Sequence, residues 1–141
     1  MENISPPNLV LGRHALIDLS GCNPDTLTDY AYIRKTLTQA ARLAKVTVVG
    51  MVDRHFKPQG YTAILVLEES HLSIHTWPEY NYVSLDLYSC NLETDFQAVQ
   101  AFLAKRFQAD RSEFTLLERG CSRATIAPMA SMPSGIAYPL S

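Results

Sequence analysis

The stretch that decides the fold is Tyr61-Thr62-Ala63-Ile64-Leu65-Val66-Leu67, followed at once by Glu68-Glu69-Ser70-His71-Leu72-Ser73-Ile74-His75-Thr76-Trp77-Pro78-Glu79. The first seven residues are apolar enough to form a buried strand. A second strand-like run, 71–77, follows after a short gap, so the two runs are predicted to pair as antiparallel neighbours. The stretch 68–79 also concentrates acids, hydroxyls, imidazoles and an indole, which is unusual for the interior of a sheet and indicates a functional site.

Further strands and helices are predicted on both sides of this pair. Strands are expected at 11–20, 46–52, 81–89 and 113–118, where apolar residues alternate or β-branched residues gather. Helices are expected from Asp25 or Thr26 to about Lys45 and from about Asp95 to Phe107, where apolar residues recur at steps of three and four. The order β-α-β-β and then β-β-α-β predicts an α+β fold, a two-layer sandwich of a mainly antiparallel sheet with two helices on one face.

Composition predicts one globular domain without a strong charge bias. The chain has 141 residues, is 47% hydrophobic and carries a formal net charge of −2, which gives no general electrostatic case for nucleic acid or an anionic membrane. No apolar run is long enough to span a bilayer and residues 1–7 lack the order of a signal peptide, so a cytoplasmic location is expected. Residues 1–10 are expected to be a loose arm, and 122–141 a flexible tail or an arm lying on a partner subunit.

The run 68–79 resembles the self-cleavage motif of the prokaryotic S-adenosylmethionine decarboxylases, which are pyruvoyl enzymes of polyamine synthesis. The resemblance extends over roughly residues 11–120, through Gly12-Arg13-His14, Pro58-Gln59-Gly60 and Tyr88-Ser89-Cys90. It implies the same α+β class, with two protomers stacked sheet to sheet in a homodimer. It also implies that S-adenosylmethionine is decarboxylated to S-adenosylmethioninamine, the aminopropyl donor for spermidine, with no metal or added cofactor.

The motif suits the chemistry that such a decarboxylase needs. Loss of CO2 from an amino acid leaves a carbanion, for which protein side chains offer no adequate electron sink. A serine hydroxyl can attack the preceding carbonyl to give an ester; elimination then breaks the chain, and hydrolysis of the resulting dehydroalanine, with loss of ammonia, leaves a pyruvoyl group. This requires a strained turn, a base and donors for the oxyanion. The resemblance places the cut between Glu69 and Ser70, giving chains 1–69 and 70–141, with Ser70 becoming the pyruvoyl group that forms a Schiff base with the substrate.

The resemblance also implies roles for five further side chains. His75 matches the histidine of processing, and Cys90 matches the donor that returns a proton to the substrate Cα; an imidazole and a tunable thiol suit these tasks. Glu79 matches an acid that binds the ribose hydroxyls, and Phe56 an aromatic that stacks on adenine and faces the sulfonium. Thr62 falls where a serine that assists processing is expected.

Three cysteines, an odd number at wide spacing, indicate reduced thiols rather than a disulfide framework or a zinc knuckle; they are Cys22, Cys90 and Cys121. Regular strand alternation would put Ser70 and His75 on opposite faces, so a shared site requires the turn at Ser70 to break the alternation. His71 and Trp77 are interpreted as structural.

Three alternatives stay open. Thr62, and Asn91 where glycine is expected after Cys90, are departures that bear on the substrate, so ornithine or arginine could replace S-adenosylmethionine, although Phe56 and Glu79 favour a nucleoside. A homologue that does not cleave could instead bind an active subunit or a nucleoside. A metal hydrolase using His71 and His75 is the third possibility, but it lacks a third ligand at motif spacing.

Overall fold

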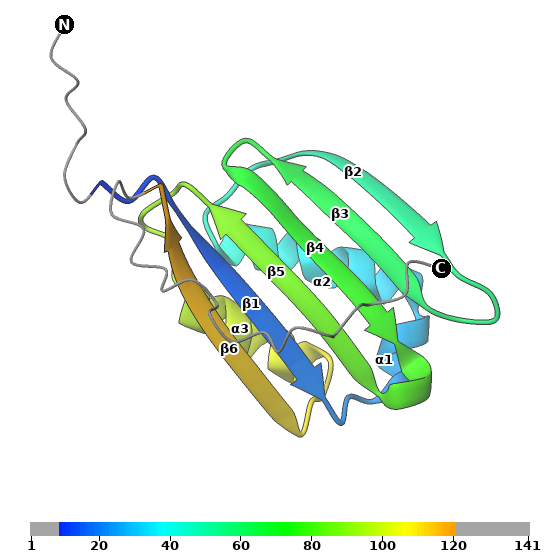
Figure 1. The fold of residues 1–141 in the computed structure, drawn as a ribbon. Helices are drawn as coiled ribbons and strands as arrows, with labels where there is room; N and C mark the ends of the chain where they lie inside the picture. The colour runs from blue at the N-terminus through cyan, green and yellow to red at the C-terminus, as the bar shows by residue number, and fades with distance from the viewer. Residues whose placement is uncertain (1–8, 121–141) are drawn as a thin grey trace, which may run out of the picture.

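The computed structural model describes residues 9–120, so nearly all of the predicted arm and the whole predicted tail, 122–141, lie outside the described residues. Figure 1 shows the order of the elements along the chain. They are β1 (Gly12–Ser20), α1 (Pro24–Thr28), α2 (Tyr30–Leu43), β2 (Val48–His55), β3 (Tyr61–Leu67), β4 (Ser70–Trp77), a 3-10 turn η1 (Pro78–Tyr80), β5 (Tyr82–Ser89), α3 (Phe96–Arg106) and β6 (Arg111–Arg119).

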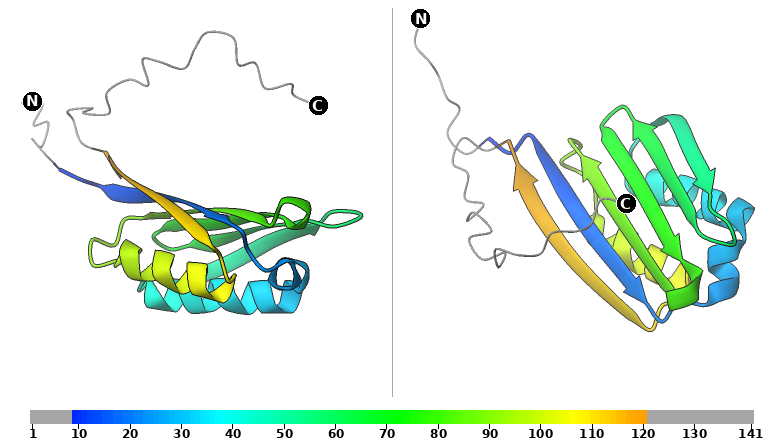
Figure 2. Two further views of the ribbon diagram at one scale, coloured as in Figure 1. Left: turned by 90° about the horizontal axis from the view of Figure 1, so that it is seen from below. Right: turned by 45° about the vertical axis from the view of Figure 1, so that its right-hand side comes forward.

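The six strands form one sheet in the order β2-β3-β4-β5-β1-β6, and every neighbouring pair is antiparallel. The helices of residues 9–120 all lie on one face of this sheet, and none of them covers the other face (Figure 2). We call the second surface the open face. The predicted α+β class, with its antiparallel sheet and its helices on one side, is therefore confirmed.

The core lies between the sheet and the helices because the strands alternate. In β5 every second residue, from Val83 to Ser89, is buried, and Ala63 and Leu65 of β3 are buried beside them. The helix α2 supplies the facing apolar surface; its buried residues are Ile33, Thr36, Leu37, Ala40 and Ala41. The same alternation turns the remaining strand residues, many of them polar, towards the open face.

The first predicted helix is wrong in one respect, because the structure divides it at Asp29. This residue has an extended backbone, and its side chain accepts a hydrogen bond from the N–H of Tyr32, so it caps α2. Asn23 caps α1 in the same way by accepting from the N–H of Asp25. Capping side chains here compete with a continuous helix. Within residues 9–120 no helix is long and apolar enough to cross a membrane.

Both edge strands are longer than predicted. β2 continues through Asp53, Arg54 and His55 because these residues pair with β3 down to Tyr61, and β6 pairs with β1 along the whole of Gly12–Ser20. A run of charged residues in a sequence usually indicates a loop. Such residues are nevertheless well tolerated on an edge strand, where they also discourage pairing with other chains.

Leu37→Ala should lower the free energy of unfolding by about 2–5 kcal/mol, because Leu37 is fully buried and its loss leaves a cavity under the sheet. Leu43→Ala is the matched control on the same helix, since Leu43 is 41% exposed and should cost less than about 0.5 kcal/mol. Urea unfolding of both variants in a Ser70→Ala background, where the chain is expected to stay in one piece, measures the difference. Equal losses would mean that α2 does not pack as described.

Candidate active site

The predicted cleavage position lies in the turn between β3 and β4. Leu67 pairs with Ser70, so Glu68 and Glu69 alone make the turn, and Ser70 also pairs with Ser89 of β5. Ser70 has a φ of 149°, a backbone conformation that residues with a side chain rarely adopt. Such strain persists only where the surrounding structure imposes it. Here two flanking strands hold the serine.

The carbonyl that precedes Ser70 is bound by a backbone donor. The N–H of Cys90 donates to the carbonyl oxygen of Glu69 over 3.1 Å. The side chain of Cys90 is exposed and makes no disulfide with another described residue. The Glu69–Ser70 bond and Cys90 are therefore adjacent.

The turn is also fastened to the loop that follows α2. The Glu69 carboxylate accepts a hydrogen bond of 2.8 Å from the N–H of Thr47, and the N–H of Glu68 donates to the Thr47 carbonyl. Asn91, which follows Cys90, donates from its side-chain amide to the carbonyl of Lys45 over 2.8 Å. The departure from glycine at this position thus has a structural role, because Asn91 ties the Cys90 segment to the end of α2.

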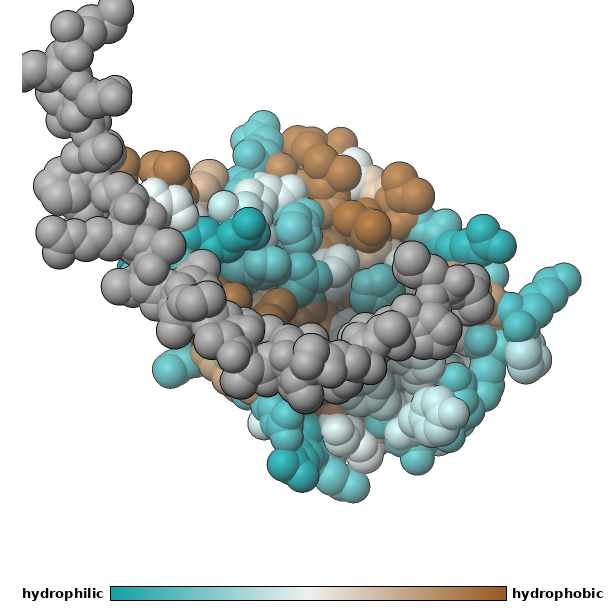
Figure 3. Space-filling model, in the orientation of Figure 1, coloured by the Kyte–Doolittle hydropathy of each residue, from teal (hydrophilic) through white to brown (hydrophobic). Residues whose placement is uncertain are grey.

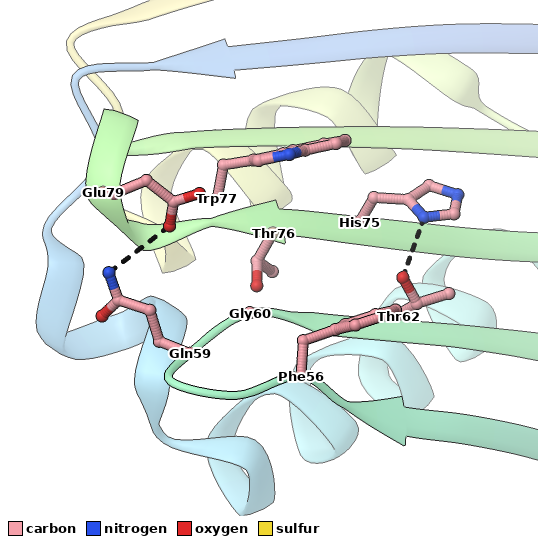
Figure 4. A pocket seen from close by; sticks show the side chains of 8 residues that line it. All are labelled: Phe56, Gln59, Gly60, Thr62, His75, Thr76, Trp77 and Glu79. Carbon is pink, nitrogen blue, oxygen red and sulfur yellow. Dashed lines mark hydrogen bonds between the residues drawn. The ribbon is translucent and has the colours of Figure 1, made fainter. Parts of the chain in front are cut away.

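A pocket of about 390 Å³ opens at the other end of β4. It is lined by Phe56, Gln59, Gly60, Thr62, His75, Thr76, Trp77 and Glu79. Phe56 and Trp77 lie on opposite sides of it (Figure 4), and the amide of Gln59 donates to the Glu79 carboxylate over 3.4 Å. A cleft that combines aromatic walls with convergent polar groups is a form suited to a small-molecule site.

His75 stands in this pocket with a fixed ring. Its Nδ1 lies 3.0 Å from the hydroxyl of Thr62, on the neighbouring strand β3 (Figure 4). The pairing of Thr62 with His75 in the ladder explains why the two side chains meet. Threonine therefore supplies the hydroxyl partner that was expected from a serine.

A third group of polar side chains lies on the open face between the turn and the pocket. The Asp86 carboxylate is 2.7 Å from Nε2 of His14 and 2.8 Å from Nε2 of His71, and it also accepts from the Ser73 hydroxyl. Burial raises the pKa of Asp86, but the hydrogen bonds from Ser73, His14 and His71 outweigh burial and hold the pKa below its ordinary value. Asp86 is therefore a carboxylate held by two imidazoles.

Comparison with known proteins identifies the family. The family model described as S-adenosylmethionine decarboxylase matches residues 13–120. The chain belongs to the S-adenosylmethionine decarboxylase family.

The individual relatives agree with this assignment. An S-adenosylmethionine decarboxylase proenzyme of Parasynechococcus marenigrum (strain WH8102) is 38% identical over 102 residues, which cover 72% of this chain and 80% of the relative. One from Pyrococcus furiosus is 31% identical over 110 residues, 78% of this chain and 79% of the relative. A crystal structure of the adenosylmethionine decarboxylase from Aquifex aeolicus VF5 superposes with a TM-score of 0.74 at 30% identity, covering 82% of this chain and 95% of that one.

In this S-adenosylmethionine decarboxylase family member, the predicted site residues form two groups rather than one. Glu69, Ser70 and Cys90 meet at one end of β4, whereas Phe56, Thr62, His75 and Glu79 gather at the other. Five residues of extended strand separate Ser70 from His75, a length of about 16 Å. The unusual backbone at Ser70 does not shorten that distance, so one protomer does not bring the two together.

Sequence reasoning missed two features of the S-adenosylmethionine decarboxylase site region. Trp77, interpreted as structural, lines the pocket; its position two residues after His75 on the same strand face could have indicated this. His71, also interpreted as structural, joins His14 and Asp86, whose contact spans 72 positions of the chain. The registers of β1 and of β4 on β5 reveal that cluster.

Proposed function

We propose that this member of the S-adenosylmethionine decarboxylase family is a proenzyme that cuts itself between Glu69 and Ser70 and then decarboxylates S-adenosylmethionine, providing the aminopropyl donor for spermidine. The observation that carries the proposal is the Glu69 carbonyl, which accepts a hydrogen bond of 3.1 Å from the N–H of Cys90 directly before the strained Ser70.

The turn supplies two of the requirements for self-cleavage. Attack of the Ser70 hydroxyl on the Glu69 carbonyl carbon places negative charge on the carbonyl oxygen, and the N–H of Cys90 is already directed at that atom. The positive φ of Ser70 stores about 1–3 kcal/mol in the ground state, which breaking the Glu69–Ser70 bond would release. Both features fit a serine destined to become a pyruvoyl group, whose carbonyl would supply the electron sink for decarboxylation.

The missing requirement is a base, and a homodimer can provide it. The open face exposes apolar side chains on β2 and β3 (Figure 3), with Val52 71%, Ile64 43% and Val66 46% exposed. Covering such a face requires a partner. Two open faces related by a two-fold axis that runs between the sheets and across the strands would put the turn of one protomer against the pocket of the other. Each site would then combine Ser70 and Cys90 with the partner's His75, Thr62, Phe56 and Glu79.

The pocket favours a nucleoside substrate over ornithine or arginine. Phe56 and Trp77 offer two aromatic walls for a purine and for the positive sulfonium, and the Glu79 carboxylate can accept hydrogen bonds from two ribose hydroxyls. Ornithine and arginine have nothing to place between these groups. CO2 release measured on the three substrates should show a preference of at least about 10³-fold for S-adenosylmethionine. Preference for either amino acid would overturn the nucleoside assignment and leave the pyruvoyl chemistry intact.

Cleavage itself is tested by the intact mass of the purified protein beside a Ser70→Ala control. The wild-type chain should give two fragments divided after Glu69, and the fragment that begins at position 70 should be lighter by one molecule of ammonia than a fragment that begins with serine. Ser70→Ala should remain whole because it has no hydroxyl to attack the carbonyl. A single uncut chain in both samples would contradict the proposal and favour a binding subunit.

Thr62→Val should slow self-cleavage by about 10- to 100-fold, because His75 loses the hydroxyl that fixes its ring and a positioned base contributes about 10²–10⁴ in all. Thr62→Ser is the matched control and should cleave at close to the wild-type rate. The appearance of fragments in a cell-free translation reaction, followed at several pH values, gives both the rate and any change in the pH profile. An unchanged Thr62→Val rate and profile would exclude Thr62 as a positioning residue.

A further inference from the structure

We propose that Tyr30, at the start of α2, and His55, at the end of β2, are positioning residues for Phe56 and thereby determine how tightly the pocket binds the adenosine end of the substrate. The inference rests on the proposed function, because it takes the pocket to be the nucleoside site. The rings of Tyr30 and His55 are stacked, with centroids 4.1 Å apart and an angle of 24° between their planes. Both residues lie outside the pocket lining, so their effect on the substrate passes through Phe56.

The end of β2 needs such a restraint. β2 is an edge strand of the sheet, paired with β3 (Figure 1). Every residue of β2 except Gly50 is exposed, so the strand contributes little to the core. Segments with few buried contacts open locally at a lower free energy than core strands do. Phe56 follows the last residue of this strand, and its N–H donates to the Gly60 carbonyl over 2.9 Å. A side-chain contact from α2 at the end of β2 therefore has a strong influence on where Phe56 lies.

Strand alternation connects this contact to the pocket. His55 pairs with Tyr61, whose side chain is buried on the helix side of the sheet, so His55 points to the same side. Phe56, the next residue, lines the pocket on the opposite side. The Tyr61 ring completes an aromatic cluster, with centroids 5.1 Å from Tyr30 and 5.2 Å from His55. Because the cluster lies on the helix side, a sheet-to-sheet dimer leaves it uncovered.

Charged groups beside the cluster make a smaller contribution. The Asp53 carboxylate accepts a hydrogen bond of 2.6 Å from the Tyr61 hydroxyl, and it lies 3.4 Å from the Arg34 guanidinium and 3.8 Å from Nε2 of His55. The side chains of Arg34 and His55 are 41% and 47% exposed, so water weakens both charge pairs. The stacked rings are therefore the main restraint from α2, and the Tyr30 ring is the group to remove.

The test is calorimetric titration of the purified full-length protein with 5′-methylthioadenosine, the adenosine end of the substrate without its amino acid. Its binding requires neither cleavage nor a pyruvoyl group. Tyr30→Ala and His55→Ala should each weaken binding by about tenfold, because a misplaced ring loses contact with the ligand. Tyr30→Phe keeps the ring and should restore wild-type affinity. Tyr32→Ala is the matched control: it removes an aromatic side chain of α2 that contacts Arg106 of α3, so the affinity should not change.

A double-mutant cycle shows whether the contact acts through Phe56. In a Phe56→Ala background, Tyr30→Ala should weaken binding by less than about twofold, since no ring is left to position. Equal losses with and without Phe56, or unchanged affinity in both Tyr30→Ala and His55→Ala, would overturn the positioning role alone. Should circular dichroism show that Tyr30→Ala is unfolded, His55→Ala decides, because His55 is an exposed residue. A wild-type protein that does not bind the nucleoside would overturn the proposed substrate and this inference together.

Discussion

Co-expression of a Ser70→Ala chain with a His75→Ala chain should restore the cleavage that neither variant shows alone. Within one protomer the two residues are separated by five strand positions, and His75 is fixed to Thr62 in a pocket remote from the turn. In a mixed dimer, one site would combine the Ser70 of the His75→Ala chain with the His75 of the Ser70→Ala chain. The second site of that dimer would lack both residues.

The expected pattern is specific to a site shared between protomers. Only the His75→Ala chain should be cut, and with random pairing about half of its copies should be cut, because about half of them have a Ser70→Ala partner. Intact mass spectrometry with distinct tags on the two chains measures this fraction. The matched control replaces the Ser70→Ala chain with a chain that carries Ser70→Ala, Thr62→Val and His75→Ala together. That chain offers no base to its partner. Cleavage of His75→Ala expressed alone, or none in the mixture, would contradict the shared site.

Cys90→Ala should impair decarboxylation but leave self-cleavage intact. The alanine keeps the backbone N–H that binds the Glu69 carbonyl, so self-cleavage should continue. The thiol that returns a proton to the substrate Cα is lost, so kcat should fall by about 10²–10⁴. Fragment formation and CO2 release, measured on the same preparation, give the two rates.

Cys22→Ala is the control for loss of a thiol. Cys22 is buried, and burial, together with the nearby charge of Asp110, raises its pKa to about 11, so it stays protonated and unreactive. Its loss should leave kcat unchanged. An uncut Cys90→Ala chain would show that the thiol itself takes part in cleavage, and a Cys90→Ala enzyme with full kcat would assign the proton to another donor.

Much of the fold could be predicted because short stretches of the sequence contain the patterns that define its strands and helices. The alternation in 61–67 and 82–89 and the three-and-four spacing in α2 are short-range patterns that directly reflect burial. The break at Asp29 was missed because no proline or glycine marks it, and a capping aspartate resembles any polar residue on a helix surface. The predicted strand 46–52 stops short of the polar residues at the end of β2 for a different reason: their pairing partner on β3 is not visible in their own segment.

The sequence suggests the candidate site residues but not their arrangement. Ser70 and Cys90 are 20 positions apart in the sequence, yet they meet because β4 pairs with β5. Ser70 and His75 are close in sequence, yet an extended strand keeps them apart. The His14–Asp86–His71 cluster depends on the register between distant strands, which periodicity in one sequence does not define.

The strand order has a consequence for the two chains that cleavage at Glu69–Ser70 would produce. Residues 1–69 hold β1, β2 and β3, and residues 70–141 hold β4, β5 and β6, but β1 lies between β5 and β6. Neither fragment possesses a continuous sheet, so the pieces should remain interleaved under native conditions. Unfolding would then release two separate molecules, and their reassembly would become a second-order reaction. Because the two fragments must reassociate, the melting temperature of the cut protein should rise with protein concentration. Dilution after denaturation should leave the two fragments unassociated.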